Sequence, residues 1–358
     1  MIGGIPFDFG QNYKLGNGPW FVIEGDEYDT AFFDKGPKFL HYAPRMVILT
    51  SIEFDHADIY RDLEHVVESF RRLIALVPDD GLIIANGDDS IIWEEVKQAG
   101  CPVELYGFGN GNRWRVAQEA IQDGWTHVDI LREGEPYAEV VTPLYGRHNI
   151  SNLLSTVVLA NALEIPLPQL KKALRSFQGV KRRQEVIGKQ NGVLILDDFA
   201  HHPTAVRETV KAVKKHYSGR LIAVFEPRSN SSRRNIFQAQ YAGAFEGADQ
   251  VMIPEPPLMA MIPPEDRFSS EGLVNDLKHR GTAATYFEHT ELLLEHLIET
   301  VQPGDVVLFM SNGGFDNLPR RLFAGRGDDY RLLRTDNSTK IFFAQRRPSE
   351  TKNKGFTG

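Results

Sequence analysis

The chain has 358 residues, enough for two domains of ordinary size, and its 42% hydrophobic and 25% charged residues are typical of a globular protein. The net charge of −8 argues against a general nucleic-acid binder but leaves an anionic small substrate open. The single cysteine, Cys101, excludes an internal disulfide and favours a reducing, cytoplasmic compartment. No apolar run reaches the roughly 18–20 residues of a membrane helix, and residues 1–13 do not resemble a signal peptide.

The first half of the chain alternates strand-like and helix-like patterns. Apolar residues spaced three and four apart over residues 61–77 predict an amphipathic helix. Shorter alternating runs between 101 and 145 predict a small β-hairpin region. The other predicted strands are WFVIE (20–24), RMVILT (45–50) and GLIIAN (81–86), and the other predicted helices cover 91–100, 149–163 and 167–177.

A second cycle of strands and helices follows the basic stretch VKRRQE (180–185). Five buried-type strands that alternate with helices predict a parallel, doubly wound α/β domain. We place the domain boundary so that residues 1–180 and 181–326 form two domains, and we expect residues 327–358 to be a flexible tail. The predicted strands are 192–198, 220–226, 250–255, 284–288 and 305–311, and the predicted helices are 203–216, 234–245, 269–279 and 289–300.

In open parallel sheets, ligands bind at the carboxyl ends of the strands. Glu24 ends one predicted strand, and His56 follows another within the acidic segment 51–60. Carboxylate and imidazole side chains at neighbouring strand ends can hold a divalent cation. The alternative is that these acidic residues cap turns and the helix that follows.

The segment GRHNISN (146–152) places His148, Asn149 and Asn152 at the start of a predicted helix. Asparagine amides both donate and accept hydrogen bonds, so they can recognise a base edge or a ribose. Simple helix capping is the alternative interpretation.

Two arginines, Arg182 and Arg183, lie at the proposed hinge between the domains. Guanidinium groups pair well with phosphate oxygens, and domain junctions often form ligand clefts. A solvated basic turn explains the same residues equally well.

Three loops after predicted strands of the second half are rich in polar groups. DDFAHHPT (197–204) brings carboxylates and two histidines to a strand–helix junction, a composition that indicates a functional site. EPRSNSSRRN (226–235) resembles a carboxylate- or phosphate-binding loop, and the glycines of SNGGF (311–315) allow close approach to a ligand. The candidate residues in these loops are Asp198, His201, His202, Arg228, Ser229, Asn230, Arg233 and Asn312.

The sequence contains no G-x-x-x-x-G-K-[ST] phosphate loop. Its one Gly-Lys pair, Gly188-Lys189, is followed by Gln190 and Asn191, and GFGNGN (107–112) has the character of a turn. By itself, this chain is therefore not expected to bind a triphosphate in the usual way.

Together these segments resemble the Mur ligase family, ATP-dependent amide-forming enzymes of bacterial cell-wall synthesis. The motifs that carry the resemblance span about residues 1–326 in the family's order. The branch most similar in detail joins UDP-N-acetylmuramate to the tripeptide L-alanyl-γ-D-glutamyl-meso-diaminopimelate in peptidoglycan recycling. The motifs are FVIEGDEYD (21–29), the longer run 27–45, SIEFDHADIY (51–60), GRHNISN, the hinge arginines, DDFAHHPT, EPRSNS and MSNGGF (310–315).

The resemblance implies a fold, cofactors and residue roles. The fold would be α/β, the remainder of a central P-loop-type ATPase domain followed by a Rossmann-like C-terminal domain. The cofactors would be ATP and Mg²⁺, the reaction would pass through an acyl phosphate, and neither nucleic acid nor membrane would be a partner. The implied roles are metal binding and catalysis for Glu24 and His56, catalysis for Arg182 and His202, nucleotide contact for His148, Asn149, Asn152, Arg183 and Asp198, and substrate contact for His201, Arg228, Ser229, Asn230, Arg233 and Asn312.

The chain departs from the family's pattern at its start. Family members carry a UDP-sugar-binding domain and a phosphate loop ahead of the motifs found here, so we expect a fragment that is inactive alone. The alternatives are the family's L-alanine-adding ligase, which has Tyr-Gly in place of Phe199-Ala200, and a non-catalytic ligase-like binding protein. The HHPT motif argues against the folylpolyglutamate synthase branch.

Overall fold

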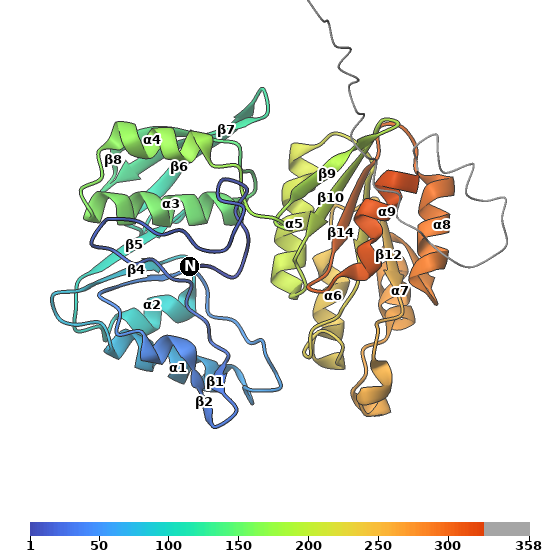
Figure 1. Cartoon of the computed structure of the whole chain (residues 1–358), viewed down its shortest axis with the longest axis horizontal. Helices are drawn as coiled ribbons and strands as arrows, with labels where there is room; N and C mark the ends of the chain where they lie inside the picture. The colour runs from blue at the N-terminus through green and yellow to red at the C-terminus, as the bar shows by residue number, and fades with distance from the viewer. Residues whose placement is uncertain (326–358) are drawn as a thin grey trace, which may run out of the picture.

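Within residues 1–325, which the computed structural model describes, two six-stranded sheets lie side by side, each covered by helices on both faces (Figure 1). A short two-stranded hairpin, β1 (Asp29–Ala31) and β2 (Asp34–Pro37), precedes the first sheet. The predicted tail, 327–358, lies outside the described residues. No helix in the described part is both long and apolar enough to cross a membrane.

The first sheet has the strand order β3-β4-β5-β6-β7-β8, parallel from β3 to β6 and antiparallel from β6 to β8. Buried apolar residues form one cluster under α1 and α2 and another under α3 and α4. The predicted helices and hairpin region of this half are confirmed. The elements are β3 (Met46–Leu49), α1 (Leu63–Ala75), β4 (Leu82–Asn86), α2 (Ser90–Val96), β5 (Val103–Gly107), β6 (Trp114–Gln122), β7 (Trp125–Arg132), β8 (Glu135–Thr142), α3 (Arg147–Ala162) and α4 (Leu167–Ser176), with a 3₁₀ turn at Lys38–His41.

The second sheet has the order β13-β12-β11-β14-β10-β9, and its five predicted strands are present and parallel. Helices α5, α6 and α7 cover one face and α8 and α9 the other, so the doubly wound prediction is confirmed. Two elements were not predicted: the antiparallel edge strand β9 (Glu185–Gln190) and α9 (Leu318–Gly325). The other elements are β10 (Val193–Asp198), α5 (Pro203–His216), β11 (Leu221–Phe225), α6 (Gln238–Ala244), β12 (Gln250–Pro254), α7 (Ser270–His279), β13 (Ala283–Phe287), α8 (Thr290–Thr300) and β14 (Val306–Met310), with 3₁₀ turns at Asn235–Phe237, Met259–Met261, Pro264–Asp266 and Phe315–Asn317.

The prediction of a strand over residues 20–24 is wrong, so Glu24 does not end a strand. The backbone of this run bonds to Met1: the Met1 amino group donates to the Val22 carbonyl at 2.7 Å, and Glu24 N–H donates to the Met1 carbonyl at 2.9 Å. Phe21 is 75% exposed. An apolar run becomes a strand only when a neighbouring strand takes up its backbone hydrogen bonds, and the described residues provide none here.

The link between the sheets is fixed by the N-terminal segment. Phe7 N–H donates to the Gly179 carbonyl and Lys181 N–H donates to the Ile5 carbonyl, around a bridge between Pro6 and Val180. The start of the chain thus pairs with the residues that lead into the second sheet, which restricts how the two halves are oriented.

Candidate functional site at the domain junction

Loops that follow strands of both sheets meet at the junction. The segment after β3 contacts the loop after β11: Ala57 N–H donates to Ser231 Oγ at 3.1 Å, and Asn230 Nδ2 donates to Asp58 Oδ2 at 2.9 Å. Residues more than 170 positions apart in sequence are therefore neighbours, as expected when the carboxyl ends of strands from two domains face each other.

His202 forms hydrogen bonds with both domains. Its Nε2–H donates to the Phe54 carbonyl at 3.2 Å, and its Nδ1 accepts from the backbone N–H of Thr204 at 3.3 Å. The Thr204 hydroxyl donates to Glu53 Oε2 at 2.6 Å across the same contact. Both ring nitrogens of His202 are engaged, so it caps α5 and positions the 51–58 segment.

His201 is placed differently. Its Nδ1–H donates to the Phe199 carbonyl at 3.0 Å, and its Nε2 lies 3.8 Å from Asp55 Oδ2. Burial lowers the pKa of His201, so the ring is neutral near pH 7 and Nε2 keeps its lone pair. Of the two histidines, His201 is the one with a ring nitrogen that makes no hydrogen bond to the described residues.

The two predicted metal ligands have separate partners. His56 Nε2 lies 2.7 Å from Glu27 Oε1, whereas Glu24 accepts a hydrogen bond from Gly3 N–H. Burial opposes the charge of His56, but the Glu27 hydrogen bond and nearby Asp55 outweigh it and raise its pKa. Among residues 1–325, no group of three or more His, Cys, Asp or Glu side chains is placed to hold a metal ion. The described residues therefore form no Mg²⁺ site from protein ligands alone, and Glu24 or His56 would need the phosphates of a bound nucleotide to complete one.

The start of α3 carries buried polar atoms suited to a ligand with its own donors and acceptors. Asn149 Nδ2 donates to the Tyr145 carbonyl at 2.9 Å and to Gln184 Oε1 at 3.0 Å, so it joins α3 to the hinge. His148 Nδ1 and Gln184 Nε2 are buried and find no hydrogen-bond partner within the described chain. Burial lowers the pKa of His148, which leaves the ring neutral. Asn152 is exposed one turn further on.

The hinge arginines differ in how they are held. Arg182 donates to the Ser311 carbonyl, and its Nε lies 3.3 Å from Asp197 Oδ2, so it is bound to the second domain. Arg183 is exposed and stacks on the Phe199 ring at 4.9 Å. Burial raises the pKa of Asp197 to about 6, although the nearby Arg182 charge acts to lower it. Of the pair, Arg183 has the guanidinium more available to an anionic ligand.

The buried Asp198 carboxylate accepts hydrogen bonds from Gln184 N–H at 2.7 Å and Ala200 N–H at 2.7 Å. This arrangement gives Asp198 a positioning task at the hinge, and its contact with a nucleotide stays a prediction.

The arginine loop after β11 presents Arg228 and Arg233. Arg233 donates to Asn230 Oδ1 at 3.0 Å and to the Pro257 carbonyl at 3.4 Å, which leaves it largely committed to the protein. Ser229 Oγ donates to Ser232 Oγ at 2.8 Å and shapes the turn. Arg228 is half-buried against Gly313, and Oδ1 of the preceding residue, Asn312, is buried without a hydrogen-bond partner in residues 1–325. Arg228 is therefore the better candidate to bind a substrate carboxylate.

Several residues of the junction were not among the predicted site residues. They are Glu27, Glu53, Gln184, Glu226 and Ser311, which contact predicted site residues. Glu226 and Ser311 are the last residues of the predicted strands 220–226 and 305–311, so the strand-end rule already indicates both positions from the sequence. The other three depend on which loops meet.

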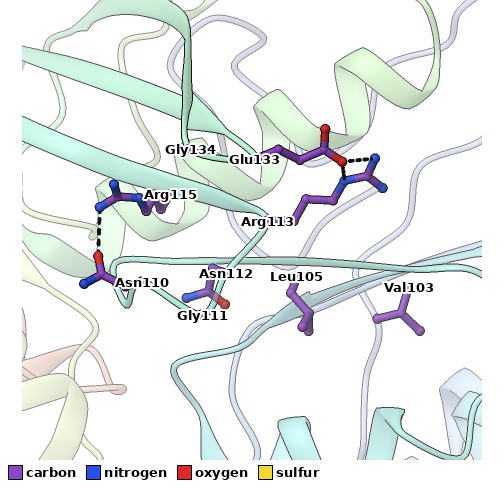
Figure 2. A pocket seen from close by; sticks show the side chains of 9 residues that line it. All are labelled: Val103, Leu105, Asn110, Gly111, Asn112, Arg113, Arg115, Glu133 and Gly134. Carbon is purple, nitrogen blue, oxygen red and sulfur yellow. Dashed lines mark hydrogen bonds and ion pairs between the residues drawn. The ribbon is translucent and has the colours of Figure 1, made fainter.

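A pocket of about 630 Å³ lies on the first domain, between β5, the 110–113 turn and the β7–β8 turn (Figure 2). Its charged side chains have partners in the pocket: Arg113 pairs with Glu133 at 2.6 Å, and Arg115 donates to Asn110 Oδ1 at 2.9 Å. None of the predicted site residues lines it.

The chain belongs to the Mur ligase family. The family's middle domain matches residues 21–160, and its glutamate ligase domain matches residues 182–313. The chain is 38% identical, over 91% of its length and 69% of the relative's, to the Escherichia coli K12 UDP-N-acetylmuramate–L-alanyl-γ-D-glutamyl-meso-2,6-diaminoheptandioate ligase. The Haemophilus influenzae ligase of the same name is 35% identical over 90% of this chain and 69% of that protein.

The fold also matches solved structures. A murein peptide ligase from Psychrobacter arcticus superposes with a TM-score of 0.62 at 28% identity, covering 89% of this chain and 66% of that one. The predicted family and fold class are thus confirmed.

Proposed function

We propose that this chain supplies the nucleotide- and acceptor-binding domains of an ATP-dependent ligase that joins UDP-N-acetylmuramate to L-alanyl-γ-D-glutamyl-meso-diaminopimelate. The observation that carries the proposal is the meeting of strand-end loops at the domain junction, with Arg228 and the lone pair of His201 on one side and the 51–58 segment on the other. The 38% identity to the E. coli ligase supports this acceptor.

The proposed reaction forms one amide bond and consumes one phosphoryl group. Bound ATP would supply that group to the muramyl carboxylate, and the acceptor amine would then attack the acyl carbon as phosphate leaves. His201 Nε2 would take the proton that the acceptor ammonium must lose before it attacks. Arg183 would offset charge on the transferring phosphoryl group, and Arg228 would bind an acceptor carboxylate. A closed junction would exclude water from the activated acyl group.

The nucleotide would lie against the start of α3. His148 Nδ1 and Gln184 Nε2, both buried and unpaired in the described chain, would bond to the base or ribose, and Asn149 would fix Gln184 in place.

The test is ATP-dependent phosphate release with UDP-N-acetylmuramate and either the tripeptide or free L-alanine, with mass spectrometry of the product. Because the 358-residue sequence has no phosphate loop, we expect no turnover from it alone. We expect turnover from a fusion that adds the part of the E. coli relative that this chain does not match. Amide formation with the tripeptide alone supports the proposal, and formation with L-alanine alone assigns the other ligase.

A direct binding measurement distinguishes a non-catalytic binding protein from a ligase. Calorimetric titration of the 358-residue chain with tripeptide should give saturable heat. Binding without any turnover in the fusion favours the non-catalytic interpretation, and neither binding nor turnover refutes the proposal.

Glu24→Gln tests the predicted metal role. In the active fusion, we expect turnover at limiting Mg²⁺ to fall by on the order of 100-fold, because the neutral amide is a weaker ligand for a hard cation. Excess Mg²⁺ should restore part of the rate. Glu64→Gln, at an exposed carboxylate of α1, is the control and should leave the rate unchanged. Equal Mg²⁺ dependence of Glu24→Gln and the unmodified fusion refutes the role.

A further inference from the structure

A buried acid–hydroxyl pair lies beneath Arg228. Glu226 and Ser311 are 2% and 1% exposed and directly follow the adjacent strands β11 and β14. The Ser311 hydroxyl donates to Glu226 Oε1 at 2.8 Å and accepts from Gly313 N–H at 3.0 Å. Burial raises the pKa of Glu226, so its carboxylate depends on these partners. The pair is a fixed acceptor at the base of the arginine loop.

Arg228 rests on this pair and on Gly313. Its Nη1 lies 3.5 Å from Glu226 Oε2. A Cβ at position 313 would lie 1.8 Å from Arg228 Cδ and 2.3 Å from its Nε, so any side chain there must displace the arginine. Gly313 is not among the residues with left-handed φ, so the space, not the backbone angle, requires glycine.

The same serine contacts the hinge. The Ser311 carbonyl accepts a hydrogen bond from Arg182, which also pairs with Asp197 at the end of β10. The ends of three adjacent strands, β10, β14 and β11, are thus linked from the hinge to Arg228.

We propose that Glu226, Ser311 and Gly313 are positioning residues that hold the Arg228 guanidinium in the orientation that binds a carboxylate of the acceptor. The identity of that carboxylate rests on the proposed function, whereas the positioning itself does not. A free arginine must lose much side-chain freedom when it binds a ligand, and an arginine already held in place loses less. Positioning should therefore increase acceptor affinity without a contact between these three residues and the ligand.

Gly313→Ala tests the proposal, with Gly314→Ala as its matched control. Position 314 has no atom within 4 Å of an added Cβ and has φ −75°, which alanine adopts freely. The first readout is the Arg228 Nε–Hε NMR signal of the 358-residue chain, assigned by its loss in Arg228→Lys. The second is the tripeptide dissociation constant. We expect Gly313→Ala to move the signal and weaken tripeptide binding about tenfold, and Gly314→Ala to do neither.

A double variant separates positioning from general damage. Adding Gly313→Ala to Arg228→Ala should weaken tripeptide binding no further, because the arginine it displaces is already absent. The proposal is overturned if Gly313→Ala lowers tripeptide affinity equally with and without Arg228. It is also overturned if the Arg228 NMR signal does not move in Gly313→Ala. If Gly313→Ala fails to fold, Glu226→Gln, which keeps the side-chain shape, should move the same signal. If the unmodified chain binds no tripeptide, the proposed function fails while the Arg228 signal still decides the positioning.

Discussion

Replacing Arg228 with alanine should weaken tripeptide binding by about 10- to 100-fold and leave ATP binding unchanged. A hydrogen bond to a charged group contributes about 1.5–3 kcal/mol, and each 1.4 kcal/mol corresponds to about tenfold in affinity. Arg228 is 36% exposed and, within residues 1–325, forms an ion pair only through the long contact with Glu226. The tripeptide carries several carboxylates. Isothermal titration of the 358-residue chain with the tripeptide, and of the active fusion with ATP, measures the two affinities.

Arg113→Ala is the control for this prediction. The Arg113 side chain is 40% exposed, a fraction similar to that of Arg228. Arg113 pairs with Glu104 and with Glu133, which lines the pocket of Figure 2, and none of the predicted site residues lines that pocket. Its loss should leave tripeptide affinity intact. Weaker ATP binding with normal tripeptide binding in Arg228→Ala would instead assign the arginine loop to the nucleotide.

Gly146→Ala should lower the melting temperature by several degrees and weaken ATP binding. Gly146 is the N-cap of α3 with φ 92° and ψ 144°, angles that alanine adopts only with strain of about 1–3 kcal/mol. Its added Cβ would lie 2.5 Å from the Ala212 Cβ of α5 and 3.1 Å from the His148 ring. The start of α3 must then move away from α5 and carry His148 with it.

Differential scanning calorimetry of the 358-residue chain and ATP titration of the active fusion measure the two effects. Gly111→Ala is the control, because nothing lies within 4 Å of an added Cβ at that turn and its φ is not left-handed. A melting temperature equal in the two variants would show that the α3–α5 contact tolerates a side chain. A lower melting temperature with unchanged ATP affinity would remove His148 from the nucleotide site.

Sequence reasoning identified the segments that meet at the candidate site because most of them follow strands with strong local signals. The runs before Asp198, Glu226 and Ser311 are continuous and apolar, as buried parallel strands are, and each became a strand. The ends of parallel strands meet at one edge of a sheet whatever the details of packing, so the candidate loops converge as predicted.

Residue roles within those loops could not be read from the sequence. His201 and His202 are adjacent and chemically identical, yet one keeps a free ring nitrogen and the other has both engaged. The difference depends on the Phe54 carbonyl, which is 148 positions away in sequence. The hinge arginines differ for the same kind of reason, since only the fold brings Ser311 to Arg182.

The sequence by itself determined the family, the order of most strands and helices, and the loops that meet at the candidate site. The tertiary structure alone decided that residues 20–24 form no strand, that β9 pairs along the edge of the second sheet, and that Glu226 and Gly313 lie against Arg228. The physical reason is the sequence separation of the residues that interact. Periodicity and turn signals are properties of neighbouring residues, whereas strand pairing, burial and hydrogen-bond partners depend on residues that are distant in sequence and meet only in the folded chain.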